Sequence, residues 1–262
     1  MRRTLEPHLV GRAIEDVRVF RGDVLRKPEA QDFRRLLAGR SFVGTGRHGK
    51  LLWFDLDRGV LAVHLGMSGQ LVLDSGDSPP PPHTHVVFRL AGGEQLRYRD
   101  PRRFGWMWYG DRGELDRYLK ELGWDPITNR GSRQRFCERV RGSRAGLKSL
   151  LMDQSVLAGL GNIYADEVLH HAGLSPKRRG CELSDSEFSA LSRAIEEVLA
   201  EAIAHGGTTI SDYVDGRGGP GQHQYHLRVH GRADEQCYRC GERIRRDRMG
   251  GRSTYWCPRC QR

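Results

Sequence analysis

The chain has 262 residues, with 43 Lys and Arg against 33 Asp and Glu, and a formal net charge of +10 at pH 7. This charge favours a polyanionic partner such as nucleic acid, although charge alone does not identify the partner. No apolar run approaches the length of a transmembrane helix and no secretory signal is evident, so the sequence favours a cytoplasmic protein over a membrane or secreted one.

The first 110 residues favour β-structure. After residues 2–8, which have the spacing of the last turns of a helix that stops at Gly11, apolar and polar residues alternate in short runs between turn residues. Many short strands with little helix predict an antiparallel sandwich or barrel over residues 10–110. The expected strands are 13–20, 51–56, 60–65, 70–73, 85–90, 95–99 and 106–109.

Beyond residue 112 the spacing of apolar residues becomes helical. Ser184 and Glu187 form a capping box, which predicts the start of a long amphipathic helix. Residues 216–223 are glycine-rich and are expected to form a loop. The expected helices are 113–122, 132–141, 147–154, 162–171 and 185–203.

Four cysteines near the C-terminus have the spacing of a zinc site. They form two Cys-x-x-Cys pairs separated by sixteen residues, long enough for a β-hairpin, and the hairpin is rich in arginine. Two disulfides are the alternative, but nothing suggests secretion, and the isolated Cys137 and Cys181 fit a reducing compartment. The expected ligands of one structural zinc are Cys237, Cys240, Cys257 and Cys260.

Two clusters in the β-rich part could carry chemistry. Lys50 precedes a buried strand, where an ammonium can bind phosphate or act as an amine catalyst, although a solvated lysine is the simpler interpretation. Met67 and Phe104 could be core residues. However, an arginine such as Arg102 beside an apolar side chain is how proteins unstack duplex bases and fill the gap.

Two further clusters lie in the C-terminal half. Glycines before Asn162 could present helix N–H groups to a phosphate, with Lys148 nearby, although a glycine cap between two helices is the simpler explanation. Arg252 lies on the zinc arm and is either a contact to an anion or a solvated arginine. A second metal site can be considered, but no other ligand pattern accompanies its histidines, which are His223, His226 and His230.

Taken together, these clusters resemble one family, the bacterial formamidopyrimidine-DNA glycosylases, which remove oxidised purines from DNA. Each stretch alone is modest evidence, but their order and spacing are specific, and the resemblance covers nearly all 262 residues. The matching stretches are Leu5–Gly11, His64–Gly69, Asp100–Gly105, Leu151–Gln154, Gly159–Tyr164, Gly206–Thr209 and the four cysteines.

The resemblance implies a multi-domain α+β fold. Residues 1–112 would form an N-terminal antiparallel β-sandwich, 113–223 a helix–two-turns–helix DNA-binding domain with a lesion-recognition loop, and 224–262 a β-hairpin zinc finger. The implied activity is that of a bifunctional DNA glycosylase and abasic-site lyase of base-excision repair. Such an enzyme removes 8-oxoguanine and formamidopyrimidines and cleaves the strand by β,δ-elimination. The implied partner is double-stranded damaged DNA, bound by a monomer in the bacterial cytoplasm.

The resemblance also assigns roles to single residues. Met67, Arg102 and Phe104 match the side chains that fill the hole left by an extruded base, a set typical of this branch rather than of the endonuclease VIII branch. Lys50 matches a lysine that grips phosphate and donates a proton in β-elimination, and Arg252 matches a zinc-finger arginine linked to δ-elimination.

The remaining implied contacts concern DNA. His83 and Arg102 match DNA contacts, Asn162 matches an asparagine that clamps phosphate, and Lys148 lies next to that stretch. Residues 208–225 match a mobile loop that closes over the extruded base.

The sequence departs from the family at its start. The family nucleophile is an N-terminal proline followed by glutamate, in a stretch reading Met-Pro-Glu-Leu-Pro-Glu-Val-Glu-Thr, whereas this chain opens with Met1-Arg2-Arg3, roughly nine residues later. Three explanations are open: a true start upstream of Met1, a non-catalytic relative that binds lesions, or another amine such as Lys50 as nucleophile. The first is favoured, because the shortened opening helix is expected to pack poorly.

Overall fold

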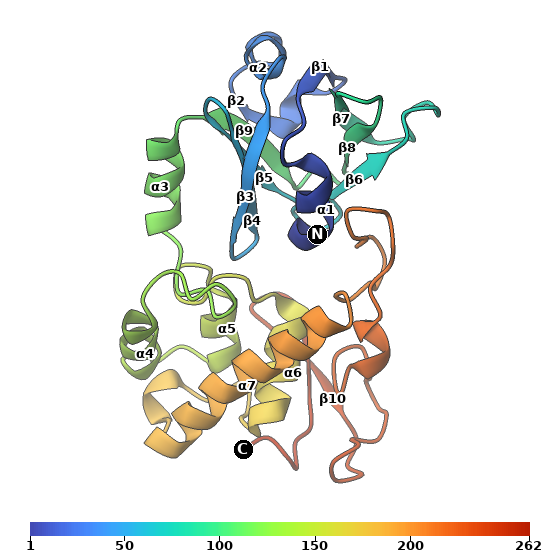
Figure 1. Cartoon of the computed structure of the whole chain (residues 1–262). Helices are drawn as coiled ribbons and strands as arrows, with labels where there is room; N and C mark the ends of the chain where they lie inside the picture. Colours follow the sequence, from blue (N-terminus) through green and yellow to red (C-terminus); the bar gives the residue numbers. More distant parts are fainter. The chain divides into compact units, whose positions relative to one another are not determined.

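The computed structural model describes all residues, Met1–Arg262, and divides them into two units (Figure 1). The first unit comprises Met1–Leu119 and Thr208–Gly221, and the second comprises Lys120–Gly207 and Gln222–Arg262. Neither unit is continuous in sequence, since the segment Thr208–Gly221 belongs with the β-rich residues. The division into three domains, 1–112, 113–223 and 224–262, stays a prediction. It assigns Thr208–Gly221 to the helical domain rather than to the β-rich one.

Two sheets form the body of the first unit. All their strand pairs are antiparallel except the parallel pair of β2 and β9. The four-stranded sheet has the order β1 (Ile14–Val19), β7 (Thr84–Leu90), β8 (Gln95–Arg99), β6 (Gln70–Asp74). The five-stranded sheet has the order β2 (Leu25–Lys27), β9 (Trp106–Gly110), β5 (Val60–His64), β4 (Leu51–Leu56), β3 (Phe42–His48).

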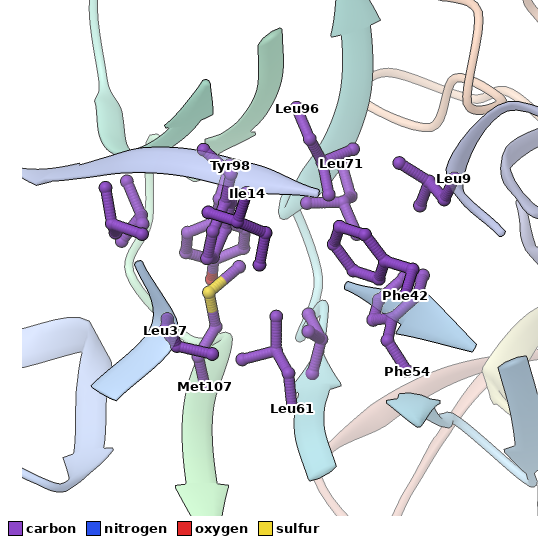
Figure 2. Close-up of a cluster of buried hydrophobic side chains, with 14 of the residues drawn as sticks. Leu9, Ile14, Leu37, Phe42, Phe54, Leu61, Leu71, Leu96, Tyr98 and Met107 are labelled. Carbon is purple, nitrogen blue, oxygen red and sulfur yellow. The ribbon is translucent and has the colours of Figure 1, made fainter. Parts of the chain in front are cut away.

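One hydrophobic core joins the two sheets, as a sandwich requires. Figure 2 shows Ile14, Leu71 and Leu96 from the four-stranded sheet facing Phe54 and Leu61 from the five-stranded sheet. The seven strands expected from the sequence are present, so the alternating pattern identified this core correctly.

Strand β4 is buried on both faces, which explains its continuous apolar sequence. Leu52 and Phe54 belong to the main core, whereas Leu51 and Trp53 belong to a second cluster on the opposite face of the sheet. Helix α3 (Arg112–Lys120) contributes Leu115 to that second cluster. The five-stranded sheet is therefore covered on both sides.

Helix α1 (Arg2–Leu9) packs well, so the expectation that the opening helix would pack poorly is wrong. Leu5 and Leu9 are fully buried in the main core. Glu6 also accepts hydrogen bonds from Arg2 Nη1 at 2.8 Å and from Thr45 Oγ1 of β3 at 2.7 Å. The eight-residue helix is too short to be stable alone and is held by these tertiary contacts.

Residues 22–48 contain elements that the sequence analysis did not predict. These are a 3₁₀ turn η1 (Gly22–Val24), β2, helix α2 (Ala30–Leu37) and β3. Phe33 and Leu37 of α2 are fully buried and lie four residues apart, a helical spacing from which this helix could have been predicted. Strand β3 has only two buried residues, Phe42 and His48, at its ends, so its sequence lacks alternation.

The second unit contains the remaining helices and a β-hairpin. Helix α7 begins with the predicted capping box, in which Ser184 and Glu187 bond to each other's backbone N–H groups. Its buried face packs on α6 and completes the core of this unit. The elements are α4 (Arg133–Arg141), α5 (Leu147–Met152), α6 (Asn162–Ala172), η2 (Gly180–Glu182), α7 (Asp185–Ala204), η3 (His223–His226), β10 (Arg245–Met249) and β11 (Arg252–Trp256).

The segment Thr208–Gly221 has neither helix nor strand, as expected for a glycine-rich loop. Two hydrogen bonds hold it to the rest of the first unit: Leu73 N–H donates to Gly216 O at 2.9 Å, and Gly216 N–H donates to Thr4 Oγ1 at 2.9 Å. A Cβ on Gly216 would lie 2.6 Å from Leu5 side-chain atoms, so glycine allows this close approach. None of the helices is long and apolar enough to span a membrane.

The burial of α1 leads to a stability prediction. Leu9→Ala is expected to lower the free energy of unfolding by about 2–5 kcal/mol, because it removes buried methyl groups and leaves a cavity. Urea unfolding followed by circular dichroism measures this change. Val10→Ala is the matched control, since Val10 is the exposed neighbour and its substitution should change stability by less than about 1 kcal/mol. Equal losses in the two variants would contradict the role assigned to α1.

Candidate nucleic-acid interface and zinc site

The four predicted cysteines come together at the base of the β10–β11 hairpin. Their sulfur atoms all lie within 4.8 Å of one another, with Cys240 and Cys257 Sγ 3.5 Å apart and Cys237 and Cys260 Sγ 3.9 Å apart. Four thiolates around zinc at about 2.3 Å are separated by about 3.8 Å, so these residues fit one tetrahedral zinc ion. His170 Nε2 lies 3.4 Å from Cys237 Sγ and is placed to orient this ligand.

The hairpin above the zinc site carries a strongly basic surface. Backbone pairing runs from Arg245 opposite Trp256 to Met249 opposite Arg252. The apolar residues of the arm, including Ile244 and Val229, pack around the cysteines, which leaves the arginines in solvent. The exposed arginines of the arm are Arg243, Arg245, Arg246, Arg248 and Arg252.

Lys148 lies at the centre of a buried polar network that fixes the hairpin to the helices. Its ammonium donates to Asp166 Oδ1 at 2.7 Å, Thr254 Oγ1 at 2.8 Å and Ser253 O at 3.0 Å. The other oxygen of Asp166 lies 2.8 Å from His230 Nδ1. The side chain of Lys148 is only 3 % exposed, so the structure gives it a positioning role, and its predicted DNA contact stays a prediction.

Asn162 and Arg252 are brought close together by the same network. Asn162 Nδ2 donates to Ser253 O at 3.0 Å, which places the first residue of α6 beside the residue that follows Arg252. The side-chain oxygen Oδ1 of Asn162 is buried and has no hydrogen-bond partner in the protein. The N-terminus of α6 and the tip of the zinc arm therefore form one surface on the second unit, suited to a phosphate group.

The connection between α5 and α6 is held by a residue to which the sequence analysis gave no role. Gln154 Nε2 donates to Met152 O and Leu160 O, both at 2.9 Å, while its Oε1 accepts from Gly159 N–H at 2.9 Å. Gly159 has a φ of 108°, which favours glycine. Gln154 thus fixes the turn that leads into Asn162.

Asp100 organises the corresponding site on the first unit, and it also lacked an assigned role. Its carboxylate is fully buried and accepts from Ser68 Oγ at 2.5 Å and from the N–H groups of Gly105 at 2.8 Å and Arg102 at 3.2 Å. Burial raises the pKa of Asp100, but the hydrogen bonds from Ser68, Gly105 and Arg102 outweigh burial and hold the pKa below its ordinary value.

This carboxylate joins two loops that carry exposed apolar side chains. Met67 is 64 % exposed and Phe104 is 55 % exposed, so neither is a core residue. Arg102 Cζ lies 4.8 Å from the centre of the Phe104 ring, a cation–π contact. A Cβ on Gly66 would lie 2.6 Å from backbone atoms of the 102–105 loop, so the two loops touch directly. The structure therefore brings together the three predicted void-filling residues.

The other predicted residues of the first unit lie around these loops. His83 is exposed, has a φ of 66°, and its carbonyl accepts from Asp100 N–H at 3.0 Å. Lys50 is exposed in the β3–β4 turn. Burial, and then the positive charge of Lys50, lower the pKa of His64, whose ring stacks on Trp106. The exposed side chains of Met67 and Phe104 beside Arg102 form an apolar wedge on the first unit. Lys50 and His83 belong to this same unit, whereas Lys148, Asn162 and Arg252 belong to the other.

A cysteine zinc site with an arginine-rich hairpin, a helix N-terminus with an asparagine, and exposed apolar residues beside an arginine are features of a DNA-binding protein. Three family models match in order: the formamidopyrimidine-DNA glycosylase N-terminal domain over residues 1–107, its H2TH domain over residues 122–214, and a zinc finger found in FPG and IleRS over residues 234–262. The chain belongs to the formamidopyrimidine-DNA glycosylase family.

Individual relatives are similar over nearly their whole length. The formamidopyrimidine-DNA glycosylases of Pelotomaculum thermopropionicum and Geobacillus kaustophilus are both 43 % identical to the chain, covering 100 % of it and 96 % and 97 % of the relatives. Among solved structures, the complex between Lactococcus lactis Fpg and DNA with an abasic site has a TM-score of 0.93 at 34 % identity. It covers 100 % of this chain and 96 % of that one. A complex of a variant of the same protein with DNA containing Fapy-dG also has a TM-score of 0.93, at 33 % identity.

The lowered pKa of Asp100 predicts a pH-dependent contribution to stability. A carboxyl with a lower pKa in the folded state stabilises the protein fully above its unfolded pKa of about 3.9, and this stabilisation is lost as the pH falls through the folded pKa. Asp100→Asn should therefore cost about 1.5–3 kcal/mol at pH 7, with the difference from the parent protein shrinking below about pH 4.

Urea unfolding at a series of pH values measures this difference. Asp77→Asn is the control, because Asp77 is exposed in a loop of the same unit and should show no such effect. A difference for Asp100→Asn that stayed constant down to about pH 2 would show that the carboxylate charge is not involved.

The zinc site leads to a prediction about the arm. Cys237→Ser should lose zinc and unfold the β10–β11 hairpin, because a small metal domain has too little apolar core without its metal. DNA affinity should fall, while the strand signal of the first unit in circular dichroism is retained. Cys181→Ser, at an exposed cysteine outside the site, should keep both zinc and affinity. Unchanged DNA affinity in Cys237→Ser would count against a role of the arm in binding.

Proposed function

We propose that this protein scans duplex DNA for oxidised purines, extrudes the damaged nucleotide and removes its base, as a DNA glycosylase and abasic-site lyase of base-excision repair. The observation that carries the proposal is the pair of exposed apolar side chains, Met67 and Phe104, on loops fixed by the buried carboxylate of Asp100. Met67 and Phe104 lie on touching loops beside Arg102, and exposed apolar side chains that gather in one place mark a surface for a binding partner.

A base stack from which one nucleotide has been extruded is such a partner. Stacking of a base on an aromatic side chain contributes about 1–3 kcal/mol, and Phe104 can supply this in place of the missing neighbour. Arg102 has guanidinium donors that can bind the base left unpaired on the opposite strand. Met67, which is flexible and polarisable, can fill the remaining space.

Basic and polar side chains of the two units would bind phosphates of the DNA backbone. Lys50 and His83 in the first unit, and Asn162 and Arg252 in the second, are the proposed contacts to phosphates near the lesion. Lys148 would act indirectly, by fixing Ser253 and so the position of Arg252. Because each phosphate contact releases counterions, affinity should fall steeply with salt concentration.

The chemistry in this family starts from a secondary amine. An N-terminal proline attacks C1′ of the sugar, displaces the base and forms an iminium, and the neighbouring glutamate transfers protons. In the proposal, Lys50 donates a proton in β-elimination and Arg252 assists the δ-elimination. A second candidate function is damage recognition without chemistry, carried by the exposed loops of the first unit and the basic zinc arm.

We also propose that the protein acts as a monomer in a bacterial cytoplasm. One chain carries both the wedge loops and the phosphate-binding residues, so recognition requires no second copy. A sedimentation coefficient of the protein without DNA that rises with protein concentration would contradict the monomer.

Phe104 provides the test of recognition. Phe104→Ala should weaken binding to a duplex with an abasic site about tenfold, since it removes one stacking contact, and should leave binding to undamaged duplex nearly unchanged. Phe20→Ala is the matched control, because Phe20 is 53 % exposed on the same unit, close to the 55 % of Phe104. Fluorescence anisotropy at fixed salt measures both. An equal loss of affinity on both duplexes would contradict the wedge role.

Borohydride trapping separates the two candidate functions. The polypeptide Met1–Arg262 is expected to bind abasic-site DNA but to form no covalent adduct, because no proline amine stands at its start. Adding Met-Pro-Glu-Leu-Pro-Glu-Val-Glu-Thr directly before Met1, with the initiator methionine removed, should produce an adduct and strand cleavage. An adduct with the unextended polypeptide would refute the expected need for the proline. No adduct with the extended one would favour recognition without chemistry.

A further inference from the structure

Three histidines and a glutamate gather at the C-terminal end of α7, away from the cysteine site. Glu201 lies in the last turn of α7, and His205 follows one turn later as its C-cap residue. His223 begins the 3₁₀ turn η3 and faces His205. His226 stacks on His205 with ring centres 3.9 Å apart. Neither Glu201 nor His205 was considered as a ligand from the sequence, since eighteen residues separate the two halves of the cluster.

The distances within this cluster are those of a metal site. His205 Nδ1 and His223 Nδ1 are 3.1 Å apart, and one ligand atom from each of Glu201, His205 and His223 lies within 4.8 Å of the others. Two imidazole nitrogens that bind one tetrahedral zinc ion at about 2.0–2.1 Å are separated by about 3.3 Å. The pair is therefore within a few tenths of an ångström of the spacing that zinc requires.

The backbone holds the two histidines in this arrangement. Gln222 N–H donates to His205 O at 2.9 Å, and His223 N–H donates to Gly207 O at 2.9 Å. His223 is only 2 % exposed, so its ring cannot turn away without leaving its packed site. Residues Glu201 and His205 are four apart, a spacing that places two ligands on the same side of a helix.

Arg228 fixes the position of the carboxylate in this cluster. Its Nη2 donates to Glu201 Oε2 at 3.2 Å, which orients this carboxylate and leaves its second oxygen outside the ion pair. Arg228 Nη1 also lies 2.7 Å from His171 Nδ1, and His171 Nε2 lies 2.8 Å from Glu197. Arg228 therefore contacts one carboxylate directly, that of Glu201, and is linked to Glu197 only through His171.

One histidine of this part of the chain lies outside the cluster. His230, which the sequence analysis grouped with these histidines, instead binds Asp166 and takes no part.

We propose that Glu201, His205 and His223 form a second metal site, which takes a divalent transition metal such as Zn²⁺ and completes its coordination with water. This set of one carboxylate and two imidazoles matches a known type of zinc coordination. His205 precedes the segment Thr208–Gly221 and His223 follows it, so a bound metal closes this segment at its base and restricts the loop that the family resemblance links to the extruded base.

Metal content tests the proposal on the whole zinc-loaded protein. After equilibration with a small excess of Zn²⁺ and gel filtration, mass spectrometry should find two zinc ions per chain. His205→Ala and His223→Ala should each retain one, and the retained cysteine-bound zinc shows that the variant is folded. Glu196→Gln removes an exposed carboxylate of α7 that pairs with Arg133, outside the cluster, and should keep two. One zinc in the parent protein, or two in both histidine variants, would overturn the proposal.

Cobalt distinguishes this site from the thiols. Adding Co²⁺ to the protein with its cysteine zinc in place should give visible absorption of a nitrogen and oxygen site, without the intense ultraviolet charge-transfer bands of thiolate ligands. The absorption should disappear in His223→Ala. Thiolate bands in place of this absorption would show that the added metal binds cysteine sulfur instead, which would count against the proposed site.

Discussion

The buried ion pair between Lys148 and Asp166 is the interaction on which the second unit depends. It joins α5 and α6 to the zinc hairpin through Ser253 and Thr254, and both charges are removed from water. A pair of this kind adds little net stability, because desolvation offsets most of the attraction, but either charge alone would be strongly destabilising. Its value is therefore geometric: the hairpin has one position in which both charges are satisfied, and that position sets Arg252 beside the N-terminus of α6.

Asp100 does for the first unit what Asp166 does for the second. Each is a buried carboxylate that accepts several hydrogen bonds, including one or more from a residue distant in sequence, and each fixes the position of exposed residues nearby. Both units thus use a buried, hydrogen-bonded carboxylate to position exposed residues, although those residues have different roles. One unit presents an apolar wedge with an arginine, and the other presents phosphate-binding donors. Zinc adds to the second unit because the few apolar residues around the cysteines are too small a core to hold a hairpin of exposed arginines.

Local patterns in the sequence predicted most of the fold, and long-range contacts account for what they missed. The strands with alternating apolar and polar residues, the capping box at Ser184 and the paired cysteines each depend on residues close in the chain. The structure contains all three as predicted. Helix α2 was missed although Phe33 and Leu37 have helical spacing, because only two apolar anchors mark it. The role of Asp100 could not be predicted, since its partner Ser68 is thirty-two residues away. The burial of Lys148 likewise depends on the distant Asp166 and Thr254, and a lone lysine in a sequence suggests an exposed cation.

The discontinuity of the first unit bears on how the chain acquires its structure during synthesis. Thr208–Gly221 supplies contacts to β6 and α1, yet the ribosome makes it after all the helices of the second unit. The β-sandwich can form early, but its last piece arrives only when four-fifths of the chain has emerged, and the zinc arm follows still later. A product terminated before residue 208 would therefore lack part of both units, and no cut at a single peptide bond separates one complete unit from the other.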